Sequence, residues 1–105
     1  MLGGLESFVM NHFAIHYLYA ADSEDIVRVR PEHRQFLGEL RDKGQLVGSG
    51  PYTDGLGGAL IIIRLPEPAT ISDAEELMDQ DPFTQQHCLA GRTVREWNPV
   101  INVFS

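Results

Sequence analysis

Two residues with acid–base side chains, His33 and Asp81, occupy corresponding positions in two predicted helices. His33 lies three residues before Phe36, on the apolar stripe of a helix predicted over residues 28–43. Asp81 continues the apolar stripe of a helix predicted over residues 72–80. A histidine can accept a proton near neutral pH, and a carboxylate on its other ring nitrogen fixes the tautomer and stabilises the imidazolium. If both helices cover one sheet, the two side chains can meet as a dyad for proton transfer.

Both residues also have a structural explanation. A histidine on an apolar stripe is usually a core residue with one satisfied hydrogen bond. Asp81 precedes Pro82, and an aspartate before a proline at the first helical position is a common N-cap, here of a short helix within residues 82–90. One carboxylate oxygen could cap this helix while the other contacts His33, so the two roles are compatible.

The segment Gly48-Ser49-Gly50-Pro51 has the composition of a pocket floor at the end of a predicted strand. Glycine in a strand often marks a bulge or a close approach of a ligand, and the missing side chains would leave room for that ligand. Ser49 is expected to donate a hydrogen bond rather than to act as a nucleophile, because the Gly-x-Ser-x-Gly spacing is absent. Arg30, one turn before the histidine, is either a clamp for an anionic group or a surface arginine. The candidate substrate-binding residues are therefore Arg30, Ser49, Gly50 and Pro51.

The other histidines and Cys88 lack the spacing of a metal site. His12 and His16 are four residues apart in a predicted strand, about 13 Å, which is too far to share one ion. Cys88 has no base beside it that would activate the thiol as a nucleophile. The glycines at 55–58 lead into a strand, so they do not form a phosphate loop. We predict a site without metal or cofactor.

Four strands and two helices are predicted to position these residues. Branched and aromatic residues predict the strands, at residues 13–20, 45–52, 59–65 and 93–97. The first helix has Pro31 in its first turn and ends at Gly44, and the second begins with a capping box at 72–75. This order of elements, with right-handed crossovers, places both helices on one face of an antiparallel sheet. The predicted fold is an α+β, ferredoxin-like βαββαβ sandwich.

The strand predicted over residues 59–65 is apolar on both faces, so both faces of the sheet need cover. The chain's own helices can cover one face only. A second copy that stacks its open face on the first is the simplest cover, and it gives a homodimer in the form of a dimeric α+β barrel. The apolar tail after Trp97 could add an edge strand or reach the partner subunit. Four aromatic residues are expected in the core or in the wall of a pocket for an aromatic ligand: Tyr17, Tyr19, Tyr52 and Trp97.

Composition restricts the class of partner. The 105 residues suit one domain at residues 13–105, preceded by an N-terminal extension at residues 1–12. The net charge of −7, from 15 acids and 8 bases, argues against nucleic acid and anionic membranes, which bind basic surfaces. No apolar run reaches the ~18 residues of a membrane span, and no signal peptide is recognised. Because a single cysteine is compatible with a reducing compartment, we expect a cytoplasmic protein.

An ordered set of short motifs resembles the YciI-like (YCII-related) family. The motifs run from about residue 13 to residue 97: Arg30-Pro31-Glu32-His33, Phe36-Leu37, residues 44–51, residues 57–62, Asp81-Pro82-Phe83 and residues 94–97. The resemblance implies a dimeric α+β barrel with a suspected active site at His33 and Asp81, near Arg30 and Ser49. A few members resemble enzymes of aromatic breakdown, such as a dehydrochlorinase that acts on a chlorinated hydroxyquinol. The polar residues 85–88 depart from the family pattern.

The sequence supports three hypotheses of function. The first is a cofactor-free enzyme in which His33, oriented by Asp81, performs acid–base chemistry on a small aromatic or lactone-like substrate. Its reaction would be isomerisation, elimination or hydrolysis, with Arg30 and Ser49 holding an anionic or enolic oxygen. The second is a non-catalytic dimer that binds a small molecule in the same pocket. The third is an interaction module that uses the N-terminal extension and the tail.

Overall fold

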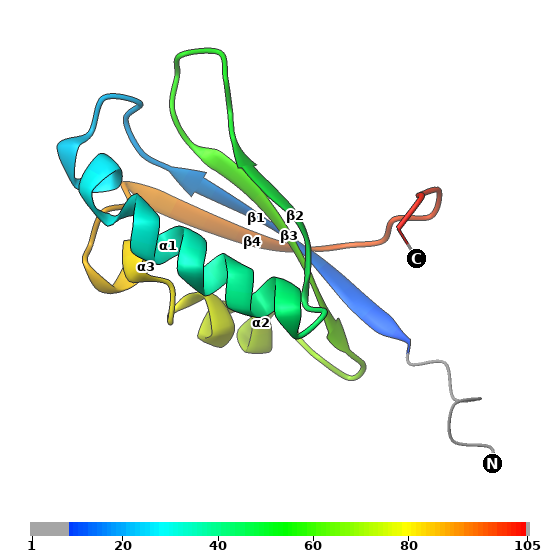
Figure 1. The fold of residues 1–105 in the computed structure, drawn as a ribbon. Helices are drawn as coiled ribbons and strands as arrows, with labels where there is room; N and C mark the ends of the chain where they lie inside the picture. Colours follow the sequence, from blue (N-terminus) through cyan, green and yellow to red (C-terminus); the bar gives the residue numbers. More distant parts are fainter. Residues whose placement is uncertain (1–8, 105) are drawn as a thin grey trace.

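A computed structural model describes residues 9–104, which form a four-stranded antiparallel sheet with three helices on one face (Figure 1). The elements, in chain order, are β1 (Met10–Leu18), α1 (Glu24–Asp42), β2 (Leu46–Pro51), β3 (Ala59–Pro66), α2 (Ile71–Met78), α3 (Pro82–Gln85) and β4 (Gly91–Trp97). The strand order across the sheet is β2-β3-β1-β4. The predicted α+β, ferredoxin-like fold is therefore confirmed. Of the predicted N-terminal extension, residues 1–8 lie outside the described residues.

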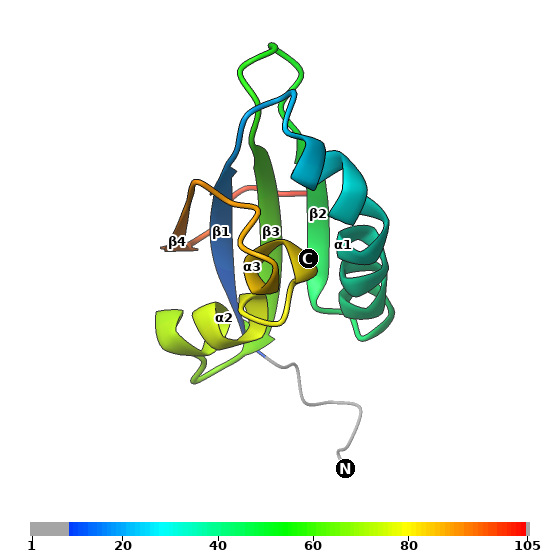
Figure 2. The same cartoon turned by 90° about the vertical axis from the view of Figure 1, so that its left-hand side faces the viewer.

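The core lies between the sheet and the helices. Figure 2 shows α1 beside β2, α2 on the side of β1 and β4, and α3 between the two longer helices. Every second residue of the two central strands points to this side, and Phe13, Ile15 and Tyr17 of β1 are fully buried there. Ile61 and Ile63 of β3 are buried on the same side. The alternation explains why one face of each central strand must be apolar.

Helix α1 begins four residues earlier than the sequence predicted, because Ser23 caps it. The Ser23 hydroxyl accepts a hydrogen bond of 3.3 Å from the backbone N–H of Ile26. Pro31 consequently lies inside the helix and not in its first turn, which corrects the prediction. The predicted C-terminal end is confirmed: Gly44 has φ +75°, and its N–H bonds back to the carbonyl of Arg41 at 2.9 Å.

The capping box of α2 lies two residues before its predicted position. The Thr70 hydroxyl accepts from the N–H of Asp73 at 3.3 Å, and the Asp73 carboxylate accepts from the N–H of Thr70 at 2.8 Å. The helix ends at Met78, and two turn residues lead to Asp81. The short helix α3 covers only four of the residues in which a further helix was expected. None of the helices within residues 9–104 has the length and apolar content needed to cross a bilayer.

The face of the sheet away from the helices is partly apolar. Leu60 and Ile62 of β3 alternate with the buried residues and lie on this open face, where they are only partly buried. Residues 98–104 form no strand; they leave the sheet at the end of β4 (Figure 1), and Phe104 packs against Trp97 with ring centroids 6.2 Å apart. The described helices therefore cover only one face of β3, as the order of the elements predicted.

Candidate active site

The side chains of His33 and Asp81 meet under the helices. His33 extends from α1, and its Nδ1 lies 2.8 Å from Asp81 Oδ2 and 3.0 Å from Oδ1. Both groups are buried, with His33 6% and Asp81 0% exposed. Because a carboxylate only accepts, Nδ1 carries a ring proton, and in the neutral form of the ring Nε2 has a lone pair. No described residue forms a hydrogen bond with Nε2.

Asp81 receives hydrogen bonds from two further donors. The backbone N–H of Phe83 donates to Oδ1 at 3.0 Å, so Asp81 is the N-cap of α3, with Pro82 in the first turn. The hydroxyl of Tyr17, from β1, donates to Oδ2 at 2.8 Å. Burial and the adjacent carboxylate raise the pKa of Tyr17, so this phenol stays protonated and remains a donor. Three donors offset the cost of burying the carboxylate, and Asp81 caps α3 while it contacts His33.

The imidazole ring of His33 is held in its plane by an aromatic contact. It stacks on the ring of Phe83, with centroids 4.0 Å apart and an angle of 11° between the planes. Phe83 is itself buried and also contacts Tyr17 edge-on. The stacking and the carboxylate together fix the direction in which Nε2 points.

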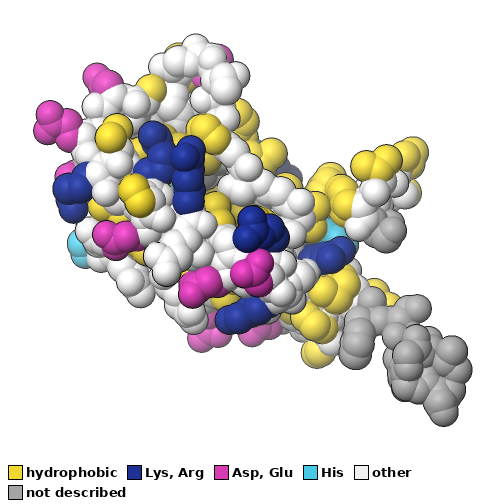
Figure 3. Space-filling model, viewed as in Figure 1, with side chains coloured by type: hydrophobic (Ala, Val, Ile, Leu, Met, Phe, Trp, Pro, Cys, Tyr) yellow, Lys and Arg dark blue, Asp and Glu magenta, His cyan; other side chains and the backbone are white. Residues whose placement is uncertain are grey.

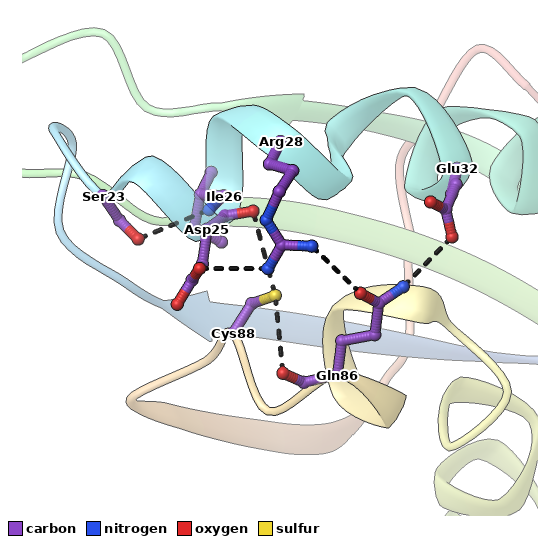
Figure 4. A network of polar contacts seen from close by, with 7 residues as sticks. All are labelled: Ser23, Asp25, Ile26, Arg28, Glu32, Gln86 and Cys88. Carbon is purple, nitrogen blue, oxygen red and sulfur yellow. Dashed lines mark hydrogen bonds and ion pairs between the residues drawn. The ribbon is translucent and has the colours of Figure 1, made fainter.

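Hydrogen bonds between polar side chains hold the segment after α3 against the helix that carries His33. Gln86 lies between Arg28 and Glu32 of α1 (Figure 4), donating to the Glu32 carboxylate at 3.0 Å and accepting from Arg28 at 3.4 Å. Arg28 also pairs with Asp25 at 3.0 Å. These side chains are exposed, so each contact contributes little stability alone. Gln86 thus links the segment after α3 to the helix that carries His33.

A cavity of about 250 Å³ opens beside His33, between α1 and β2. All four predicted substrate-binding residues line it: Arg30 from α1 and Ser49, Gly50 and Pro51 from β2. Asp81 does not line the cavity, so any contact that it has with a ligand passes through His33. The residues singled out as a site in the sequence are therefore brought together in the fold.

The role expected for the glycines of β2 needs correction. Ser49 pairs with Ile61 on the helix-covered face, so its side chain points to the cavity side. Gly48 and Gly50 pair with Ile62 and Leu60 on the open face, and a Cβ at either glycine would meet no atom within 4 Å. The missing side chains therefore leave room on the opposite face of the sheet, and Gly50 lines the cavity with its backbone only.

Comparison with known proteins agrees with this fold. The profile of the YCII-related domain matches residues 10–98. The chain belongs to the YCII-related family. Its structure is similar to that of 5-chloro-2-hydroxyhydroquinone dehydrochlorinase (TftG) from Burkholderia phenoliruptrix AC1100 in complex with 2,5-dihydroxybenzoquinone. The TM-score is 0.67, the identity is 22%, and the match covers 83% of this chain and 93% of that chain. No match was found among the curated proteins.

The site of this YCII-related domain also contains residues that the sequence analysis did not assign to it. Arg34 and Arg41 line the cavity, and Tyr17 and Phe83 hold the dyad in place. A signal was available for the arginines, because positions four and eleven residues after Arg30 lie on the same side of a helix. Tyr17 falls on the inward side of β1, but no pattern in the sequence indicates that its hydroxyl meets a carboxylate.

His12 and His16, which were considered as metal ligands, lie on the open face of the sheet. His16 Nδ1 is 2.9 Å from the hydroxyl of Tyr52, and His12 packs edge-on against Trp97. Burial lowers the pKa of His12, with a further contribution from Arg64. Within residues 9–104, no three His, Cys, Asp or Glu side chains lie close enough together to hold a metal ion.

Proposed function

We propose that this YCII-related protein is a cofactor-free enzyme that uses His33 and Asp81 for acid–base chemistry on a small, ring-shaped substrate. One observation carries the proposal: both oxygens of a fully buried carboxylate lie at Nδ1 of His33, while the same ring lines a cavity. A histidine with a purely structural role needs no cavity beside its ring. A group that is oriented on one side and accessible on the other suits proton transfer.

In this proposal Nε2 of His33 accepts a proton from the substrate. Asp81 stabilises the imidazolium that forms, and the hydroxyl of Tyr17 keeps the carboxylate in place. Arg30 and Ser49 hold the oxygen on which negative charge develops, such as that of an enolate. If the proton returns to a different carbon of the substrate, the reaction is an isomerisation. If a leaving group departs instead, the reaction is an elimination. The similar structure is that of a dehydrochlorinase, and dehydrochlorination is an elimination, which supports this class of reaction.

The proposal includes a homodimer in which two open faces stack as an α+β barrel. The open face has a hollow of about 430 Å³ lined by Ala14, Leu60, Ile62 and Trp97 together with a few polar residues. Gly48 and Gly50 lie beside Ile62 and Leu60, so at these two positions the edge strand presents no side chain that would keep a second copy away. Burying this apolar surface favours association.

A non-catalytic binding dimer is the second candidate. One observation favours it: Asp81 already serves as an N-cap and as the acceptor for Tyr17, so the fold would keep this carboxylate without any catalysis. The two candidates differ in what happens to a bound compound. An enzyme releases a changed product, whereas a binding protein returns the ligand unchanged.

A ligand screen followed by product analysis separates the two candidates. Thermal shift would be measured with hydroxylated aromatic compounds, lactones and 2,5-dihydroxybenzoquinone, because a ligand stabilises the fold that binds it. On a compound that is converted, His33→Asn should lower turnover by about 10²- to 10⁴-fold, with affinity changed only a few-fold. Unchanged turnover in His33→Asn would refute the enzyme. A ligand recovered unchanged, with affinity lost in the variant, would establish the binding protein.

A further inference from the structure

Three arginines lie in one row on the cavity side of α1. Arg30, Arg34 and Arg41 all line the cavity. At about 100° per residue they fall within roughly 40° of one another around the helix axis. Successive members are about 6 Å and about 10 Å apart along the axis. Figure 3 shows basic side chains along the border of α1 that faces β2.

The positive charge of this row is not neutralised by acids in the cavity wall. None of the residues that line the cavity is acidic, although the chain has 15 acids and a net charge of −7. Glu32 and Glu39 lie about 180° to 200° around the helix from Arg30. Within residues 9–104, Arg30 and Arg34 form no ion pair, and the only ion pair of Arg41 is with the exposed Asp42, whose Oδ1 lies 3.3 Å from both Nε and Nη2. The helix therefore presents its positive side to the cavity and negative residues to the other side.

Gly38 leaves space beside this row. It lies inside α1, where glycine is less favourable than alanine, and it lines the cavity. A Cβ at Gly38 would lie 3.8 Å from Nη2 of Arg41. Nη2 of Arg41 therefore lies beside Gly38, about one turn back along the helix. This matches the direction in which long side chains point from a helix.

We propose that the substrate is a single-ring compound with a permanent anion, a carboxylate, sulfonate or phosphate, and that Arg34 and Arg41 bind this anion. Guanidinium groups bind such anions through paired, charge-assisted hydrogen bonds. Arg30, one turn before His33, binds the substrate oxygen next to the reacting carbon. The cavity of about 250 Å³ limits the compound to one ring and a short chain. The orientation of the substrate rests on the function proposed above, whereas the preference for an anion does not.

Matched acid and ester probes test this proposal by equilibrium binding. The probes are 2,5-dihydroxybenzoate and 3-(2,5-dihydroxyphenyl)propanoate, each with its uncharged methyl ester, and phenyl phosphate and benzenesulfonate as the other anions. Dissociation constants would be measured for the wild type, Arg34→Gln, Arg41→Gln and the double variant. Lys43→Gln is the control, because it removes the same charge at the end of the same helix, outside the cavity wall.

The wild type should bind at least one acid about tenfold more tightly than its ester. Each arginine variant should lose about tenfold in affinity for that acid and keep its affinity for the ester, while Lys43→Gln retains the preference. The proposal is overturned if no anion binds more tightly than its uncharged partner, or if the preference survives in the double variant. His33→Asn should keep the preference for the acid over its ester. Turnover that does not depend on His33 would therefore refute the acid–base function without changing the result for Arg34 and Arg41.

Discussion

Replacing Gly38 by alanine should raise stability and weaken ligand binding at once. The glycine has no positive φ and lies inside α1, so alanine is compatible with its backbone. The new Cβ would meet only Nη2 of Arg41, at 3.8 Å, which is an ordinary contact. Removing the conformational freedom of glycine in a helix is worth about 0.5–1 kcal/mol. For a domain of this size, that corresponds to a rise of about 2–8 °C in Tm.

The same methyl group occupies part of the cavity wall that the ligand is proposed to contact. Thermal melts with and without ligand measure both effects in one experiment, because the added ligand raises Tm only as far as it binds. Gly44→Ala is the matched control. Its φ of +75° makes alanine unfavourable, so Tm should fall by an amount that reflects about 1 kcal/mol, with binding unchanged. If Gly38→Ala were destabilising, or bound ligand as tightly as the wild type, the reasoning about this glycine would be refuted.

Three further predictions concern the dyad, the thiol and the open face. Tyr17→Phe removes a hydrogen bond to the buried Asp81, so the free energy of unfolding measured in urea should fall by about 1–3 kcal/mol. An unchanged midpoint would contradict this. Burial, with the nearby Asp25, raises the pKa of the Cys88 thiol, so less thiolate is present at pH 7 and iodoacetamide should react more slowly than with a free cysteine; a faster reaction would exclude this reasoning. Light scattering should give about twice the chain mass of 11.7 kDa, and Ile62→Glu should give the monomer; a monomeric wild type would refute the barrel.

The architecture could be predicted because it depends on periodic patterns. The alternation in β1 and the apolar stripe of α1 fixed which side of each element is buried, and they placed His33 under the helix. Gly44 marked the end of α1 because only glycine readily adopts its φ of +75°. The order of the elements then left few arrangements of the sheet. A ferredoxin-like fold with both candidate residues on the helix side followed from these features.

The details of the site depended on contacts that local patterns do not encode. Two nearby residues of the same chemical type could cap α2, and the structure uses Thr70 and not Ser72. The side on which the glycines of β2 lie depends on an irregularity in the pairing with β3 between Leu46 and Gly48, which shifts the register. The bond between Tyr17 and Asp81 joins residues 64 positions apart. Such contacts appear only once the chain is folded.

Hydrogen exchange on carbon tests the central claim, that Nε2 of His33 transfers protons, most directly. Proton NMR in deuterated water would follow the loss of the ring-hydrogen signal of 2,5-dihydroxybenzoquinone with wild-type protein, with His33→Asn and in buffer alone. The account predicts that the wild type accelerates the exchange and that His33→Asn reduces this acceleration by about 10²- to 10⁴-fold. Equal exchange rates for the two proteins, or a wild type no faster than buffer, would contradict it.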